Sequence, residues 1–160
     1  MRSQGSWLVP FTRDLVKQFL AIAHQTHLQL QQQKVYDSTY PFEEPAKVLQ
    51  RLFNSVISDR TGTKVTLGYF LGNQLFRCYF KMNNHRMCKM VFDTLAKSSI
   101  TVSSLGKADR VTFEYYQARY ELHNFHFRQA RELLIRCLDT CHANAVQQKR
   151  YLLDLRLLLT

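Results

Sequence analysis

Four cysteines carry the most reactive side chains of this 160-residue chain. Cys137 and Cys141 are four residues apart, with His142 beside the second, and His85 lies three residues before Cys88. Thiolates and imidazoles at such spacings bind zinc when a second close pair completes the ligand set on a short loop. Here the cysteines fall on or beside apolar helical stripes, where a free thiol packs as a small hydrophobic group. The pattern therefore predicts packing, and neither a metal site nor a disulfide framework.

Nucleophilic catalysis has no suitable setting in the sequence. A catalytic nucleophile needs a strained turn or glycine-rich loop that exposes it beside a base, and no cysteine here occupies one. A phosphate-binding glycine loop and a His-Glu zinc motif are also missing. His24 and His27 lie along a polar helix face, where we expect both to be solvated. We predict a protein that is not an enzyme and that has no cofactor.

Basic side chains are the remaining chemically distinctive group. The formal net charge is +10, and residues 61–97 hold six Lys or Arg against Asp93 alone, which is half of the excess. Such a surface suits an acidic partner chain or a phosphate backbone. The alternatives are a face that only favours solubility, and cations that complement a helix C-terminus. The candidate contacts are Arg77, Lys81, Arg86, Lys89, Arg119, Arg128, Arg131, Lys149 and Arg150.

Aromatic residues offer a second way to bind nucleic acid, because bases stack on exposed rings. The aromatic residues here recur at helical spacing, which is more typical of packing between helices. We expect that packing role for Phe76, Tyr79, Phe80, Phe113, Tyr115, Tyr116 and Tyr120.

Helices must position all of these residues. All three prolines lie before residue 46 and only five glycines are present, so the composition predicts an all-α fold. We expect a single helical-repeat domain over residues 1–160. Its first helix lies within residues 1–33, helices two to four within 45–97, and helices five to seven within 107–160. The apolar face of the first helix is predicted at Phe11, Leu15, Phe19, Ile22 and Leu30.

A helical hairpin is clearest over residues 71–92, which read LGNQLFRCYFKMNNHRMCKMVF. Gly68 and Gly72, one turn apart in its first helix, predict close approach of a neighbouring helix. A similar hairpin follows, and the two suggest a right-handed stack. The period of about 42 residues comes from pairing Phe76 with Ala118 and Cys88 with Ala130.

The last helix, which contains LLDLRLLL, is rich in leucine on almost every side. A helix that is apolar all round needs cover from more than one neighbour. We expect this chain to be a fragment of a longer protein, with its final leucines forming a docking surface. These are Leu155, Leu157, Leu158 and Leu159.

Five segments together resemble one known family. They are GSWLVPFTRDL, VLQRLFNSVISDR, the hairpin quoted above, RVTFEYYQARYELHNFHFRQARELL and KRYLLDLRLLLT. They are similar to the PCI-domain family, which contains the mRNA-export subunit of transcription and export complex 2 (TREX-2). A related subunit-twelve-like protein of the COP-nine signalosome is in the same family. The resemblance implies stacked helical hairpins that lead into a winged helix, and no winged helix is expected within these residues.

The resemblance also implies a function. It is that of a non-catalytic scaffold subunit in a nuclear complex that couples transcription to mRNA export. The implied partners are a second PCI-domain subunit and a small acidic proteasome-lid-type subunit, with RNA or DNA bound through the complex and no membrane. A nuclear location is expected, with a cytoplasmic pool as the alternative. Two other readings stay open: a signalosome-like or splicing-linked PCI scaffold, and an independent RNA-binding helical-repeat module.

Overall fold

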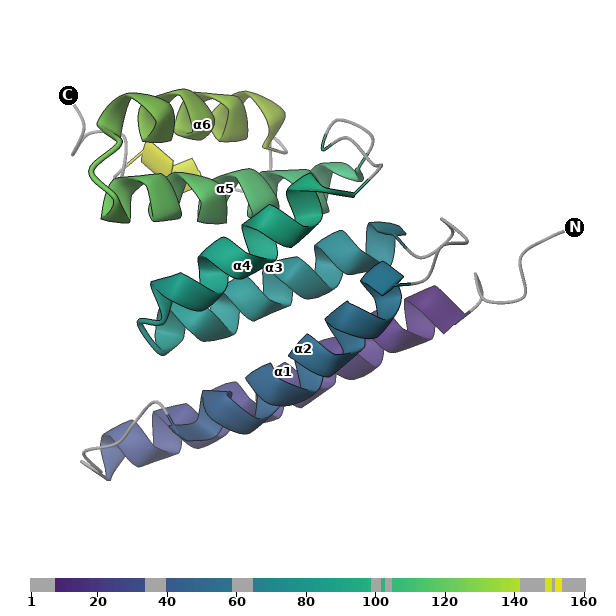
Figure 1. The fold of residues 1–160 in the computed structure, drawn as a ribbon. Helices are drawn as coiled ribbons and strands as arrows, with labels where there is room; N and C mark the ends of the chain where they lie inside the picture. Colours follow the sequence, from purple (N-terminus) through teal and green to yellow (C-terminus); the bar gives the residue numbers. More distant parts are fainter. Residues whose placement is uncertain are drawn as a thin grey trace, which may run out of the picture. The chain divides into compact units, whose positions relative to one another are not determined.

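The computed structural model describes residues 8–33, 40–58, 65–98, 102, 105–141, 149–150 and 152–153. Within these residues it holds six α-helices, one short 3-10 helix and no strand (Figure 1). The predicted all-α fold is confirmed. Internal contacts divide the chain into two compact units, Met1–Ile100 and Thr101–Thr160, and each unit is described by itself. The expected single continuous domain stays a prediction.

The first unit is built around α3, which packs against α2 on one side and α4 on the other. The helix α1 runs alongside α2 and also contacts the short helix η1 (Figure 1). Leu71, Leu75 and Phe76 of α3 are fully buried at the centre of this unit. The elements are α1 (Leu8–Gln32), η1 (Tyr40–Phe42), α2 (Glu43–Ser58), α3 (Val65–Lys81) and α4 (His85–Ala96).

Two glycines allow the neighbouring helices to approach α3 closely, as predicted. A Cβ atom on Gly68 would lie 2.9 Å from Cδ1 of Ile57 in α2. A Cβ atom on Gly72 would lie 2.9 Å from Cδ1 of Leu95 in α4 and 3.4 Å from Cγ1 of Val91. At 2.9 Å the neighbouring methyl group would have to shift to make room for a Cβ atom, so glycine at both positions permits the observed packing of α2 and α4 against α3.

An asparagine corner joins α3 to α4. Asn83 has a φ of 55°, a left-handed conformation that asparagine tolerates better than most residues. The next residue, Asn84, caps α4, because its side-chain oxygen accepts a hydrogen bond from the Met87 amide at 3.3 Å. The Tyr79 hydroxyl, near the end of α3, donates to Oε1 of Gln50 in α2 at 2.8 Å. The first bond closes the N-terminal end of α4, and the second holds the end of α3 against α2.

The second unit is a hairpin of α5 (Lys107–His123) and α6 (Phe127–Thr140). Its corner contains the only other described non-glycine residue with positive φ, Phe125 at 62°. Phe125 follows Asn83 by 42 residues, which equals the predicted repeat. The four residues that gave that repeat, Phe76, Cys88, Ala118 and Ala130, are all fully buried. The corner and the buried positions of the first hairpin therefore recur in the second hairpin 42 residues later in the sequence.

The C-terminal leucines are described only at their beginning. Leu152 is buried against a cluster that includes Ala118 and Leu134, so the hairpin itself covers this position. Leu153 is exposed. The four leucines of the predicted docking surface, Leu155, Leu157, Leu158 and Leu159, lie outside the described residues.

Candidate partner-binding surface

The cysteines are core residues, as predicted. Cys78, Cys88 and Cys137 are buried and Cys141 is half-buried, and all four are free thiols. Burial raises the pKa of Cys78 and of Cys137 to about 12, and the charge of Glu114 adds to the effect at Cys137. A thiol with so high a pKa is protonated at neutral pH and is a poor nucleophile or metal ligand.

No group of three or more His, Cys, Asp or Glu side chains within the described residues could hold a metal ion. Across the same parts of the chain, no helix is both long enough and apolar enough to span a membrane.

Two of the candidate cations lie one turn apart on α3. Arg77 and Lys81 are both exposed near the C-terminal end of this helix. Both charges act on His24 of α1, whose pKa is lowered. Burial is the main cause, and the charges of Lys81, Arg77 and His27 lower the pKa further, in that order. The local potential is therefore positive, and these side chains from α1 and α3 form one basic cluster. We call Arg77, Lys81 and His24 the α3 basic cluster.

His27 corrects one expectation from the sequence. It is buried rather than solvated, and its ring centroid lies 5.2 Å from that of Phe42 in η1. The His24 and His27 rings are stacked with centroids 6.4 Å apart. Because η1 follows α1 by several residues and folds back onto it, this burial could not be predicted from the helix pattern alone.

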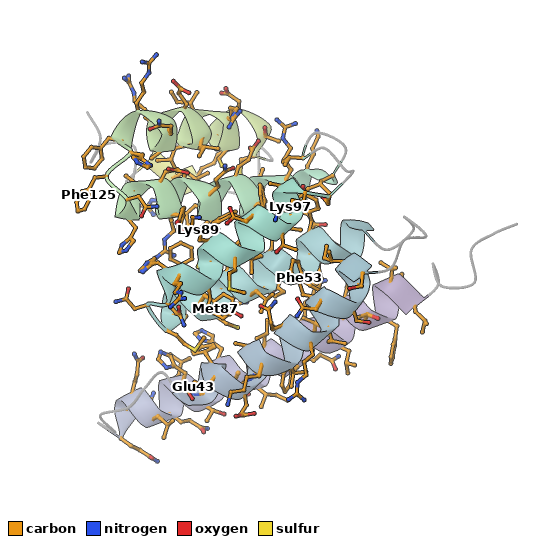
Figure 2. The ribbon with its side chains drawn as sticks, viewed as in Figure 1. Glu43, Phe53, Met87, Lys89, Lys97 and Phe125 are labelled. Carbon is orange, nitrogen blue, oxygen red and sulfur yellow. The ribbon has the colours of Figure 1, made fainter. Side chains whose placement is uncertain are left out.

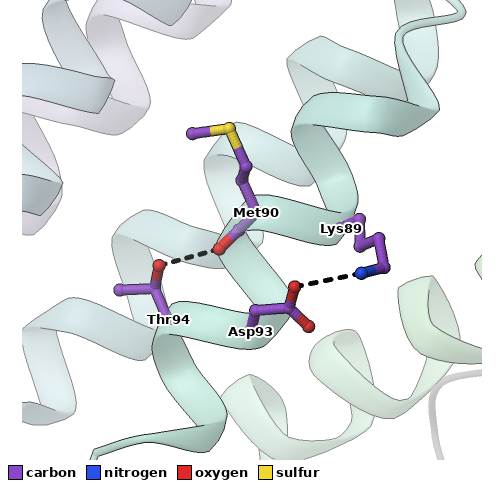
Figure 3. Close-up of polar contacts among 4 residues, drawn as sticks. All are labelled: Lys89, Met90, Asp93 and Thr94. Carbon is purple, nitrogen blue, oxygen red and sulfur yellow. Dashed lines mark hydrogen bonds and ion pairs between the residues drawn. The ribbon is translucent and has the colours of Figure 1, made fainter.

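The cations of α4 lie on its exposed side. Arg86 and Lys89 are three residues apart and both are exposed. Lys89 Nζ lies 3.4 Å from Oδ2 of Asp93, while Thr94 donates from its hydroxyl to the Met90 carbonyl at 2.7 Å (Figure 3). An exposed pair of this kind contributes little to stability, so Lys89 can exchange Asp93 for an external carboxylate.

The other candidate cations belong to the second unit. Arg119 of α5 lies over the Tyr115 ring at 5.7 Å, and Arg128 of α6 lies 3.5 Å from Glu132. Arg131 and Arg150 are exposed and Lys149 is half-buried. The structure thus brings Arg77 and Lys81 together, and places Arg86 and Lys89 on one helix face.

The apolar face predicted for α1 is wrong in its orientation. Phe11, Leu15, Phe19 and Ile22 do share a face, but that face is exposed, whereas Leu30 is half-buried. The buried side of α1 consists of Val16, Leu20, Ala23 and His27. The helix therefore has two adjoining apolar faces, and α2, α3 and η1 cover only one of them.

A groove of about 570 Å³ was not predicted from the sequence. It lies between α2 and the corner that joins α3 to α4. Glu43 on the α2 side and Met87 on the α4 side belong to its lining and are labelled in Figure 2. The lining also includes the buried Tyr79, the half-buried Met82 and the exposed Arg51. Residues from three helices form it, so no local sequence signal marks it.

The aromatic residues are mainly packing residues. Phe76, Tyr79 and Phe113 are buried, and the other four that we assigned to packing are half-buried. Four phenylalanine rings are exposed in the described part of the chain: Phe11 and Phe19 on α1, and Phe125 and Phe127 at the corner of the second hairpin. The centroids of the Phe125 and Phe127 rings lie 6.2 Å apart. Phe125 projects from the corner that joins α5 to α6 (Figure 2).

No family model matches the chain. Curated proteins match the chain, and two of them do so over 98% of its length. PCI domain-containing protein 2 of Xenopus laevis is 29% identical over 98% of this chain and 41% of the relative. The protein of the same name from Danio rerio is 30% identical with the same coverage. A CSN12 homologue of Neurospora crassa is 30% identical over 69% of this chain and 26% of its own length. The chain thus spans about two fifths of the first two relatives.

Proposed function

Because this chain belongs to the family of PCI domain-containing proteins, we propose that it is a non-catalytic scaffold subunit that holds partner chains in a multiprotein complex. The similarity extends over 98% of the chain, so it includes both helical units. The buried, protonated thiols support a role without nucleophilic chemistry. The role is mechanical: buried helix faces build a firm body, and exposed side chains recognise other proteins.

The observation that carries this proposal is the positive surface of the first unit. Residues 1–100 hold 13 Lys or Arg against 6 Asp or Glu, whereas residues 101–160 hold 9 against 6. The α3 basic cluster lies in the first unit, where Lys81 and Arg77 already disfavour protonation of His24. A nearby carboxylate would relieve this repulsion, so the cluster suits an acidic chain. The proposed partner at this site is a small acidic subunit of the proteasome-lid type.

The more specific role that we propose is a subunit of a nuclear complex that couples transcription to mRNA export. This role rests on the resemblance of the chain to the mRNA-export subunit. A second PCI-domain subunit would contact the final leucines, Leu155, Leu157, Leu158 and Leu159. RNA or DNA would bind through the assembled complex, and the protein would be nuclear.

A signalosome-like scaffold is the second candidate. It is favoured by the match to the CSN12 homologue of Neurospora crassa, which is as similar in identity but covers less of this chain. Both candidates describe scaffolds, so they differ in partners rather than in mechanism.

Co-purification separates the candidates. A tagged chain expressed in cells should retain a small acidic protein and a second PCI-domain subunit in stoichiometric amounts, both from the nuclear fraction. Recovery with signalosome subunits instead would favour the second candidate. Tight binding of the isolated chain to single-stranded RNA at low salt, without protein partners, would contradict both, because phosphate contacts are strongest there.

A further inference from the structure

An uncovered apolar face runs along the first fifteen residues of α1. Its five large side chains are 38–63% exposed, although each is of a type that is usually buried. Five such side chains present on the order of 500 Å² of apolar surface, as much as the largest patch on a typical monomer. The five are Leu8, Phe11, Leu15, Phe19 and Ile22. We call them the α1 outer face.

The spacing of these residues is symmetric about Leu15. Leu8 and Ile22 are each seven residues from it, and Phe11 and Phe19 are each four residues from it. At about 100° per residue, all five lie within about 80° around the helix, with Leu15 at the centre. The pattern is therefore nearly unchanged when the helix is reversed end to end about Leu15.

We propose that the α1 outer face binds the same face of a second copy of this chain, with the two α1 helices antiparallel and related by a two-fold axis at Leu15. This arrangement sets Leu8 beside Ile22 of the second copy and Phe11 beside Phe19. The two Leu15 side chains meet at the axis. Each apolar side chain thus meets another apolar side chain, as an isologous interface requires.

Several polar side chains around this face have partners on α1 itself. The Thr12 and Thr26 hydroxyls donate to the carbonyls of Leu8 and Ile22 at 2.8 Å and 3.0 Å, so they need no further partner. Asp14, next to Leu15, pairs with Lys17 at 3.4 Å on the same helix. The five residues of the α1 outer face are uncharged, and the nearby Asp14 carboxylate is already paired with Lys17.

The size of the contact sets the strength of the dimer. Two faces of this size together bury on the order of 1,000 Å², at the low end for a specific interface. We therefore expect a weak, concentration-dependent dimer rather than an obligate one. This dimer is independent of the acidic partner, because Arg77 and Lys81 lie on α3 and form no part of the α1 outer face.

Sedimentation velocity of the full chain at increasing concentration tests the proposal. The wild-type chain should pass from monomer to dimer, and Leu15→Glu should stay monomeric, because it would bring two carboxylates together at the axis. Leu28→Glu is the matched control: Leu28 is exposed on α1 but on the opposite side of the helix, so this variant should still dimerise. A wild-type chain that is monomeric at every concentration, or equal loss of dimer in both variants, would overturn the proposal.

Disulfide formation gives a second test that is specific to the axis. Under mild oxidation, Leu15→Cys should form a covalent dimer much faster than Leu28→Cys, because only residue 15 meets its own copy. The wild-type chain, which has the half-buried Cys141, sets the background rate. Equal rates for the two variants would exclude an antiparallel pair centred on Leu15, even if the chain dimerises by another surface.

Discussion

Gly72 of α3 lies directly against Leu95 of α4, so closely that a Cβ atom on the glycine would be 2.9 Å from the leucine Cδ1. Leu95 is fully buried, and Val91 beside it is buried as well. A side chain at position 72 would therefore have to displace a residue that is already packed in the core. The packing of the first hairpin therefore depends on a residue without a side chain.

The contacts of the two glycines predict different effects on stability when each glycine is replaced by alanine. Gly72→Ala should lower the free energy of unfolding by about 1–2 kcal/mol, because overpacking outweighs the gain in helix propensity. Gly68→Ala should be neutral or stabilising by up to about 1 kcal/mol, since the half-buried Ile57 can turn its terminal methyl away. Urea denaturation of both variants measures the difference. Equal destabilisation would show that the two helix contacts are equally rigid.

A buried carboxylate on α5 provides the second prediction. Arg110 Nε lies 3.3 Å from Oε1 of the buried Glu114, and the Oε2 atom has no hydrogen-bond partner among the residues that the structure describes. Arg110→Met should therefore lower the free energy of unfolding by about 2 kcal/mol or more, since it leaves a buried charge unpaired.

The matched control for Arg110 is Arg128, which pairs with Glu132 at the same four-residue spacing but on an exposed face. Arg128→Met should change the free energy of unfolding by less than about 0.5 kcal/mol. Similar losses in the two variants, measured by chemical denaturation, would contradict the distinction between the buried and the exposed pair.

Alkaline pH should unfold the protein through three buried groups. Burial raises the pKa of Cys78 and Cys137 from 9.0 to about 12, and that of Tyr79 from 10.0 to about 12. The unfolded chain therefore releases these protons at lower pH than the folded chain. The stability that they contribute is fully present below pH 9 and is lost as pH rises toward about 12. Thermal denaturation should show a melting temperature that falls through this range. An unchanged melting temperature between pH 8 and pH 11 would contradict the burial of these groups.

The titration of His24 reports on the α3 basic cluster. Lys81 and Arg77 contribute to lowering its pKa, so Lys81→Met should raise the pKa of His24 toward its ordinary value. Lys89→Met, on the exposed side of α4, should leave it unchanged. The His24 ring signals in an NMR pH titration measure the shift. A pKa that does not respond to Lys81→Met would place Lys81 too far away to form the cluster.

The helices and their close contacts could be predicted because local patterns determine them. Gly68 and Gly72 predicted the close approach of neighbouring helices to α3. The apolar stripes of the helices predicted that the cysteines are buried. The left-handed corner residues Asn83 and Phe125 are separated by the predicted repeat. In each case the signal lies within one helix or one corner, although the contacting residue, such as Leu95 for Gly72, lies farther along the chain.

The remaining features depend on contacts between distant segments. The sequence could not tell which of two apolar faces of α1 is buried, because α2, α3 and η1 make that choice. The burial of His27 depends on Phe42, and the groove near Tyr79 needs residues from three helices. Charge counts likewise indicated the cations but not that Arg77, Lys81 and His24 lie together.

Binding of an acidic chain by the α3 basic cluster is the central claim, and fluorescence anisotropy with a labelled peptide rich in Asp and Glu tests it most directly. The wild-type chain should bind at low salt. The double variant Arg77→Glu with Lys81→Glu should bind at least about tenfold more weakly, since two attractive contacts become repulsive. Lys107→Glu with Arg136→Glu, which makes the same change in net charge at exposed positions of the second unit, should bind nearly as well as wild type. Equal weakening by both double variants would contradict the account, because the peptide would then respond only to net charge.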